Sequence, residues 1–251
     1  MRLLIISDIH SNLEALEACL DAAPAYDLMV NLGDVVGYGA SPNQTIARVR
    51  QLGRVHVRGN HDKACSGVTT VDGFNPIAAW AARWTYAALT PENRDWLRAL
   101  PAGPLAVPGL THVQFVHGSP LDEDDYLIGL TDALQALLGI PAPVTFFGHS
   151  HVQGGFSLHR ERGSEIHPPI ELGNGAGHGE LRLQPRGHYL INPGSVGQPR
   201  DGDWRPGFAL YDSGARTVHF HRVPYDVERA MKRIHEAALP ERLATRLLLG
   251  R

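Results

Sequence analysis

Acidic, amide and imidazole side chains stand in five short motifs, and each motif directly follows a run of apolar residues. In chain order the motifs are Asp8-Ile9-His10, Gly33-Asp34, Gly59-Asn60-His61-Asp62, His117-Gly118 and Gly148-His149-Ser150-His151. Imidazole is the commonest metal ligand in proteins. A mixed set of carboxylate, amide and imidazole donors suits Mn, Fe, Zn or Ni better than Ca or a thiolate-bound ion. The motifs therefore indicate a site for divalent transition metals.

The motifs supply more donors than a single metal ion needs. The candidate ligands are Asp8, His10, Asp34, Asn60, His117, His149 and His151. A carboxylate that bridges two ions, with a water between them, accounts for such a set, so we expect two divalent metal ions. In extended backbone, residues i and i+2 point to the same side of the chain. We therefore expect the Asp8–His10 pair to project together, and likewise the His149–His151 pair.

The elements that must position these motifs alternate between strand and helix in the first 60 residues. The apolar patterns predict strands over residues 2–7, 27–32 and 53–57, with helices over 12–21 and 42–51. This alternation is typical of βαβ units with a parallel sheet. Ligands bind at the carboxyl ends of the strands in such sheets, so the five motifs can converge on one site.

The pattern changes after residue 74. Residues 74–100 are predicted to be helical, with Trp80, Trp84 and Trp96 as core anchors and Pro91 at the start of a second helix. The apolar and alternating runs that follow predict strands over 105–107, 112–116, 144–147, 207–211 and 217–223, and helices over 131–138, 226–238 and 241–249. The Gly- and His-rich residues 154–191 fit hairpins or a long excursion. We expect one domain, residues 1–251, with two packed sheets flanked by helices.

The composition is that of an ordinary globular protein and not of a disordered one. The 251 residues are 43% hydrophobic and 20% charged, with a net charge of -3. This balance predicts no strong attraction to nucleic acid or to an anionic membrane. The two cysteines, Cys19 and Cys65, are widely spaced and indicate a reduced, intracellular protein. The apolar run 3–6 is too short for a signal peptide or a membrane span, so the expected location is the cytoplasm.

The five motifs, in this order, resemble those of the calcineurin-like metallophosphoesterases, and most closely the small bacterial and archaeal phosphodiesterases of that superfamily. The resemblance runs from Asp8 to the stretch Asn192-Pro193-Gly194-Ser195-Val196-Gly197. It implies a four-layer α/β fold, in which two mixed β-sheets pack as a sandwich flanked by helices. It also implies a hydrolase that uses two divalent metal ions, with Mn as the first candidate and Fe, Ni, Zn or Co as alternatives.

The resemblance assigns a role to each motif. It implies that Asp8, His10, Asp34 and His151 hold one ion, and that Asp34, Asn60, His117 and His149 hold the other. Asp34 is then the bridge between the ions. His61 is not a ligand; with Asp34 and Asn60 it belongs to the catalytic residues, as the general acid for the leaving alkoxide. Relatives usually orient this histidine with a carboxylate, and adjacency alone does not establish that Asp62 does so here.

One departure from the family separates this chain from protein phosphatases. Those enzymes extend Gly-Asp to G-D-x-x-D-R-G, whereas Gly37 and Tyr38 stand here at the positions of that Asp and Arg. The departure favours a small substrate, and the leading hypothesis is a phosphodiesterase acting on a small phosphodiester or nucleotide. A phosphomonoesterase with the same site is the alternative. A catalytically silent binding scaffold is a third, which the complete ligand set disfavours.

Several residues near the motifs have two interpretations each. Arg200 could contact a phosphate with two hydrogen bonds or form a surface salt bridge, and Tyr38 could stack on a base or pack in the core. His219 and His221 share a strand face that we interpret as solvated, and His178 could reach the pocket. The C-terminal helix could be core or a homo-oligomer contact, and the sequence leaves this open.

Overall fold

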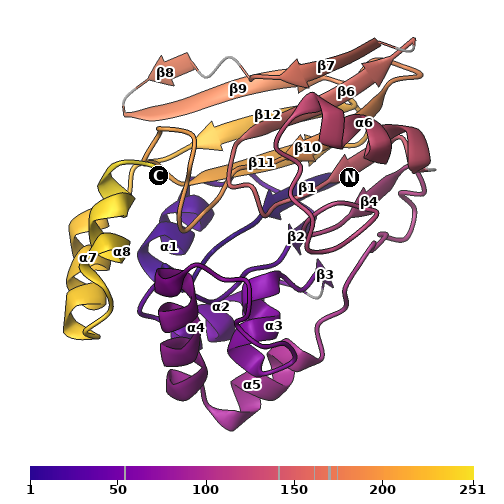
Figure 1. Ribbon diagram of the computed structural model, residues 1–251. Coiled ribbons are helices and arrows are strands. Elements are labelled where there is room, and N and C mark those ends of the chain that lie inside the picture. The colour runs from indigo at the N-terminus through magenta and orange to yellow at the C-terminus, as the bar shows by residue number, and fades with distance from the viewer. Residues whose placement is uncertain (54, 141, 161, 169–170, 174) are drawn as a thin grey trace.

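The computed structural model describes residues 1–53, 55–140, 142–160, 162–168, 171–173 and 175–251 (Figure 1). Within these ranges the strands form two mixed sheets. The larger has the order β3-β2-β1-β11-β12-β9-β8 and the smaller has the order β4-β5-β10-β6-β7. The predicted fold class, two mixed sheets flanked by helices, is confirmed.

The larger sheet is parallel at the end formed by the N-terminal strands and antiparallel elsewhere. β1 (Arg2–Ile6) pairs in parallel with β2 (Leu28–Asn31), which pairs in parallel with β3 (Val55–His56). On its other side β1 meets β11 in antiparallel register. The remaining strands of this sheet are β11 (Gly207–Asp212), β12 (Thr217–Arg222), β9 (Ala176–Arg182) and β8 (Glu171–Gly173).

The smaller sheet combines the later motif-bearing strands with two antiparallel neighbours. Its strands are β4 (Val113–Phe115), β5 (Val144–Phe146), β10 (His188–Asn192), β6 (Gly154–His159) and β7 (Arg162–Ile166). The segment 154–191 thus supplies strands to both sheets. Residues 105–107, predicted as a strand, make only an isolated bridge from Leu105 to Phe115.

The sheets pack face to face because successive side chains of each strand point to opposite sides. Leu3 and Ile5 of β1 lie in one buried cluster with Phe115, Phe146 and Ile191 of the smaller sheet. The alternate residues of β1 pack in a second cluster, against the helices. The first of these helices are α1 (Leu13–Ala22), α2 (Pro42–Leu52), α3 (Asn60–Ser66), α4 (Pro76–Ala88) and α5 (Pro91–Arg98).

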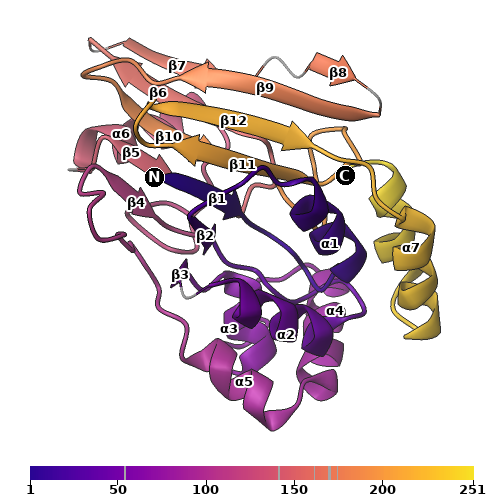
Figure 2. The same ribbon diagram turned by 180° about the vertical axis from the view of Figure 1, so that it is seen from behind.

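The outer face of the smaller sheet is covered by α6 (Leu130–Gly139), whose Ala133 and Leu137 pack with Phe156 and Leu190. Four layers result, with α2–α5 beneath the parallel strands and α6 beyond the smaller sheet (Figures 1 and 2). No helix in the described ranges is long and apolar enough to cross a membrane.

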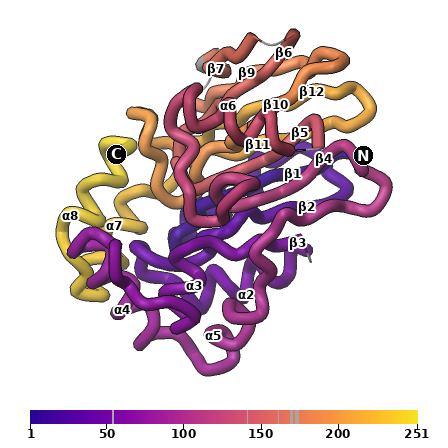
Figure 3. Tube along the Cα trace, turned by 45° about the vertical axis from the view of Figure 1, so that its right-hand side comes forward, coloured from indigo at the N-terminus to yellow at the C-terminus, as the bar shows by residue number. Residues whose placement is uncertain are grey.

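The C-terminal segment lies at the end of the molecule toward which β1 runs (Figures 1 and 3). Its elements are α7 (Val227–Glu236), α8 (Glu241–Thr245) and the 3-10 turn η1 (Arg246–Leu248), so the helix predicted over 241–249 is divided. The core role predicted for the tryptophans is wrong for Trp80, which is 42% exposed. Trp84 and Trp96 are half-buried against the helical clusters.

Candidate metal centre

The five motifs leave the carboxyl ends of β1 to β5 and meet in one place. Main-chain hydrogen bonds fix their loops to one another. The Asp8 N–H donates to the Gly33 carbonyl at 3.0 Å, and the His10 N–H donates to the Asp34 carbonyl at 2.9 Å. The Gly197 N–H donates to the Asp8 carbonyl at 2.9 Å. The convergence expected from parallel strands is therefore observed.

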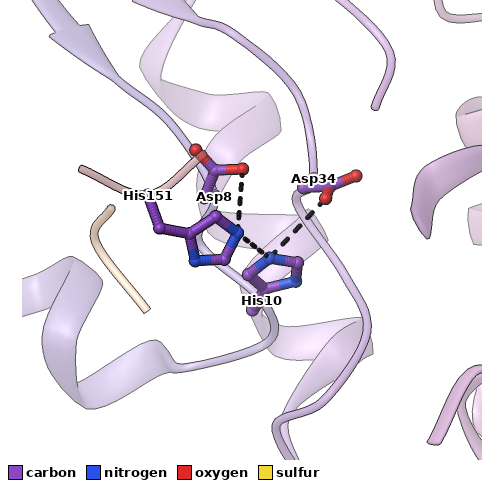
Figure 4. A group of neighbouring side chains, drawn as sticks. All are labelled: Asp8, His10, Asp34 and His151. Carbon is purple, nitrogen blue, oxygen red and sulfur yellow. Dashed lines mark hydrogen bonds and ion pairs between the residues drawn. The ribbon is translucent and has the colours of Figure 1, made fainter. Parts of the chain in front are cut away.

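Four side chains form a first buried cluster, consisting of Asp8, His10, Asp34 and His151 (Figure 4). The donor atoms of the four lie within 4.8 Å of one another. Nε2 of His151 lies 3.4 Å from Asp8 Oδ1 and 3.1 Å from His10 Nε2. Nε2 of His10 lies 3.6 Å from Asp34 Oδ2. Two imidazole nitrogens and two carboxylates thus point at a common centre.

A second buried cluster consists of Asp34, His117 and His149. Nε2 of His117 lies 3.5 Å from Asp34 Oδ2 and 3.3 Å from Asn60 Oδ1, which adds the Asn60 amide to this group. The Asp34 Oδ2 atom belongs to both clusters. One carboxylate oxygen therefore faces two sets of donors, which is the geometry that a bridging ligand requires.

The orientation of three histidines leaves one nitrogen of each ring free to act as a ligand. Their Nδ1 atoms lie at hydrogen-bonding distance from main-chain carbonyls, namely Val36 for His10 (3.1 Å), Leu32 for His117 (2.9 Å) and Gln198 for His151 (2.6 Å). A carbonyl only accepts, so each Nδ1 donates its proton and each Nε2 faces the clusters, to which it offers a lone pair when the imidazole is neutral. Such outer hydrogen bonds are typical of metal-binding histidines, and the donor set fits divalent ions.

Burial governs the protonation of the centre. Burial and the neighbouring Asp34 raise the pKa of the Asp8 carboxyl to about 6, although His117 opposes the shift. Burial also lowers the pKa of His10 and of His151 well below the usual range. Between Asp34 and His117, mutual attraction outweighs burial, so the pKa of Asp34 falls and that of His117 rises to about 9. In the described ranges no Lys or Arg forms an ion pair with either carboxylate, and divalent cations match this negative site.

The backbone of the site is strained. Among the described residues eleven that are not glycine have a positive φ, and seven of them lie in the loops of the site: Asp8, His10, Ser11, Asp34, Tyr38, His149 and His151. Left-handed backbone costs of order 1–3 kcal/mol at such residues and clusters at functional sites. The extended i, i+2 geometry expected for Asp8–His10 and for His149–His151 is therefore wrong. The first pair still shares a cluster, whereas His149 and His151 are divided between the two.

His61 lies beside the clusters without belonging to either. Its N–H donates to Asp34 Oδ1 at 2.8 Å, and its ring centroid lies 4.9 Å from that of His10. Nδ1 of His61 is buried and has no hydrogen-bond partner in the described ranges. Burial lowers the pKa of His61 to about 4. The ring is thus adjacent to the metal centre, with one nitrogen uncommitted.

Asp62 has other partners than its neighbour His61. Its carboxylate accepts from the N–H of Gly59 at 2.9 Å and from the N–H of Val36 at 3.3 Å. Asp62 therefore joins the loop after β2 to the start of α3, and it holds the main chain next to Asp34 in place. Burial and the charge of Asp34 raise its pKa to about 7.

The two residues predicted to contact substrate both lie at the edge of the centre. The Tyr38 ring is 7% exposed, and its centroid lies 4.7 Å from that of His10 and 4.4 Å from that of His61. Arg200 is half-buried, and its Cζ lies 5.9 Å from the Tyr38 centroid. Its Nη2 donates to Gln198 Oε1 at 3.1 Å, so the alternative of a surface salt bridge is not observed within the described ranges.

Three further residues line the centre without having been predicted. The Tyr126 ring stacks on His149 with centroids 3.7 Å apart. Lys63 is 5% exposed and binds the Asp124 carboxylate at 2.6 Å. Arg246 from η1 approaches Tyr38. Lys63 directly follows the third motif, a signal that sequence reasoning could have used, whereas no local pattern singles out Tyr126 or Arg246.

The remaining histidines considered from sequence lie outside both clusters. His219 faces Glu180 of the adjacent strand at 3.7 Å, and its side chain is 38% exposed, as expected for a solvated face. The same expectation is wrong for His221, whose ring stacks on Phe208 with centroids 4.7 Å apart and whose Nε2 is buried. His178 is paired with His221 in the β9–β12 register and is exposed, so it does not join the ligands.

Two cavities adjoin the centre on either side of Tyr126. One, of about 460 Å³, is lined by Asn60, His61 and His149 together with Lys63. The other, of about 290 Å³, is lined mainly by apolar side chains, with Ser150, Glu165 and Arg200 among its polar residues. The 460 Å³ cavity therefore opens on the candidate ligands themselves, and the 290 Å³ cavity lies across Tyr126 from it.

Comparison with known proteins agrees with this geometry. The sequence model of the calcineurin-like phosphoesterase superfamily domain matches residues 1–215. An uncharacterized protein of Methanocaldococcus jannaschii is 35% identical over 249 residues, which cover 98% of this chain and 97% of that protein. The crystal structure of a metallophosphoesterase from Sphaerobacter thermophilus has 37% sequence identity and a TM-score of 0.83, covering 100% of this chain and 99% of the other. A hypothetical protein of Pyrococcus horikoshii shares the fold, with a TM-score of 0.78 at 19% identity and coverage of 100% and 98%.

Proposed function

This chain belongs to the calcineurin-like phosphoesterase superfamily, and from that premise we propose that it is a phosphodiesterase acting on a small organic phosphodiester or nucleotide. Family membership implies a phosphoester hydrolase, and the buried Asp and His clusters fit divalent metal ions. The proposal narrows the substrate to diesters. The observation that carries it is the pair of cavities on the two sides of Tyr126, one of which is lined by the candidate ligands Asn60 and His149.

A phosphodiester carries an organic group on each of two oxygens, so its hydrolysis needs space on two sides of the phosphorus. The 460 Å³ cavity contains His61, which places the leaving group on that side. The apolar 290 Å³ cavity offers a surface for the other organic group. A phosphomonoester would need one of these cavities only.

We assign the roles as follows. Asp8, His10, Asp34 and His151 hold one divalent ion, while Asp34, Asn60, His117 and His149 hold the other. The chemistry that such a pair of ions supplies when bound is activation of a water and neutralisation of the phosphate oxygens. Mn is the first candidate, with Fe, Ni, Zn or Co as alternatives.

His61 is the proposed general acid. Its ring lines the 460 Å³ cavity, and its main-chain N–H donates to Asp34 Oδ1 at 2.8 Å, so the ring is held beside the bridging carboxylate. A histidine in this role contributes about 10²–10⁴-fold in rate. The pKa lowered by burial must rise when the phosphodiester enters, because its negative charge beside the ring favours the imidazolium.

We further propose that the chain acts in the cytoplasm as one domain, residues 1–251. Cys19 and Cys65 are free and buried, which suits a reducing compartment. The shared core between the two sheets supports a single folding unit.

The test is hydrolysis by protein stripped of metal and refilled with one ion at a time. With Mn²⁺ we expect release of p-nitrophenol from bis(p-nitrophenyl) phosphate, with kcat/KM about tenfold or more above that for p-nitrophenyl phosphate. Preference for the monoester would replace the proposal by a phosphomonoesterase. If the protein bound Mn, Ni, Fe, Co or Zn stoichiometrically and hydrolysed neither substrate with any of them, the proposal would be replaced by that of a catalytically silent binding scaffold.

A further inference from the structure

Two guanidinium groups meet at the ring of Tyr38, on the edge of the metal centre. Cζ of Arg200 lies 5.9 Å from the ring centroid, and Cζ of Arg246 lies 5.7 Å from it. Arg200 comes from the loop after β10, whereas Arg246 comes from η1. The tertiary structure therefore brings to Tyr38 two positive charges that lie far apart in the chain.

Neither of these arginines is neutralised by an acidic side chain. Within the described ranges the salt bridges include neither Arg200 nor Arg246, while the nearby Arg205 and Arg222 are paired with Asp203 and Asp201. In the described ranges Nε of Arg200 is buried without a hydrogen-bond partner, whereas Nε of Arg246 donates to the main-chain oxygen of Arg251. Burial and the charge of Arg200 lower the pKa of Arg246 to about 10. An anionic ligand would compensate two neighbouring positive charges that lack an acidic side-chain partner in these ranges.

A cavity of about 750 Å³ opens beside Arg246, and we call it the arginine cavity. Among the described residues it is lined by Arg242, Arg246 and Arg251 together with Tyr38, whereas Arg200 does not line it. No acidic side chain and no member of the two metal clusters is among these described lining residues. Tyr38 also lines the 460 Å³ cavity that contains His61, so the two cavities share a wall.

We propose that the arginine cavity binds a second phosphate group of the substrate, in addition to the phosphate that is cleaved at the metal centre. The inference rests on the proposed function and narrows its substrate to organic phosphodiesters that carry a further phosphate. Guanidinium groups suit this task, because each offers two parallel N–H donors to phosphate oxygens.

The spacing fits one molecule that reaches both places. The centroid distance of 4.4 Å from Tyr38 to His61 and the 5.7 Å from Tyr38 to Arg246 bound the separation of the two functional groups at about 10 Å. A sugar ring or a short polyphosphate spans such a distance. Arg200 lines the 290 Å³ cavity and not the arginine cavity, so we assign it to the phosphate that is cleaved.

The experiment compares two substrates that differ by one phosphate group. Thymidine 5′-(p-nitrophenyl phosphate) carries only the diester, and its 3′-phosphorylated form carries a further phosphate. We expect the wild-type protein to have a lower KM for the phosphorylated form. Arg246→Gln should lower kcat/KM for that form about 10–100-fold more than for the other, because it removes charge-assisted hydrogen bonds to one group. Arg246→Lys, which keeps the charge, should recover part of the difference.

Arg94→Gln is the matched control. Arg94 lies 4.7 Å from the centroid of Tyr86, so it forms the same type of contact away from the site, and its replacement should leave both substrates unaffected. If Arg246→Gln weakened both substrates equally, or if the wild-type protein did not distinguish them, the arginine cavity would not bind a second phosphate.

A binding measurement separates this inference from the proposed function. Metal-free protein should bind thymidine 3′,5′-bisphosphate more tightly than thymidine 5′-phosphate in calorimetry, and Arg246→Gln should remove the difference. This result would hold even if no diester were hydrolysed, in which case the proposed function alone would fail. Equal affinities of the wild-type protein for the two nucleotides would overturn the inference.

Discussion

Gly59 offers a direct test of how the fold positions the bridging carboxylate. A Cβ added to Gly59 would lie 2.0 Å from Asp34 Oδ1 and 2.4 Å from the Asp34 main-chain nitrogen. Ordinary van der Waals contact begins at 3.4 Å, so Asp34 or the start of α3 must move by about 1.4 Å. Backbone strain is not involved, since Gly59 has φ -103° and ψ 172°.

We expect Gly59→Ala to impair the metal centre more than the fold. A misplacement of about 1 Å at a reacting group costs about 10²-fold in rate. Overpacking of this kind destabilises a protein by about 1–3 kcal/mol. We therefore predict a loss of about 100-fold in kcat/KM for bis(p-nitrophenyl) phosphate, together with weaker Mn²⁺ binding in calorimetry and a lower urea midpoint.

Gly129 provides a matched control for this substitution. It precedes α6 in the same way, with φ -125° and ψ 168°, and its N–H donates to Asp132 as that of Gly59 does to Asp62. A Cβ at Gly129 would meet nothing nearer than 4.0 Å. Gly129→Ala should change stability by less than about 1 kcal/mol and leave activity intact. Wild-type metal affinity and rate in Gly59→Ala, or equal losses in both variants, would refute the steric argument.

Three other predictions concern the proton donor, an ion pair and the metal. His61→Gln should retain two metal ions by elemental analysis but lose about 10²–10⁴-fold in kcat; an unchanged rate would remove it from the reaction. Burial raises the pKa of Glu123, but the hydrogen bonds from Arg58 and Lys63 outweigh it, and the pKa is lowered. The free energy of unfolding of the wild-type protein should therefore exceed that of Glu123→Gln by about 1–2 kcal/mol at pH 7. That advantage should disappear in urea titrations as the pH falls below the unfolded value of 4.5, and an advantage that persisted in acid would exclude the ion pair as its source. Adding Mn²⁺ at 100 times its Kd to metal-free protein should stabilise it by about 2.7 kcal/mol, and Asp8→Ala should reduce this gain; no gain in the wild-type protein would contradict metal binding to the folded state.

The sequence by itself determined the fold class and the cluster of donors. Strand and helix periodicity is a local property, and so is the position of a polar motif directly after an apolar run. The rule that ligands gather at the carboxyl ends of parallel strands then brings together Asp8 and Asp34, after strands of the larger sheet, and His117, after a strand of the smaller sheet, as observed. The sequence alone also shows that Gly37 and Tyr38 replace the Asp and Arg of the protein phosphatases.

Only the tertiary structure decided the backbone geometry that delivers these donors. The family resemblance already implied Asp34 as the bridge and different ions for His149 and His151, but the left-handed backbone at both histidines replaces the extended geometry that sequence spacing suggested. Arg246 reaches Tyr38 only because α7 and α8 fold back against α1 and α4, where they pack next to Tyr38. Contacts of this kind join residues far apart in the chain, so their physical cause is the packing of whole elements, which no local pattern records.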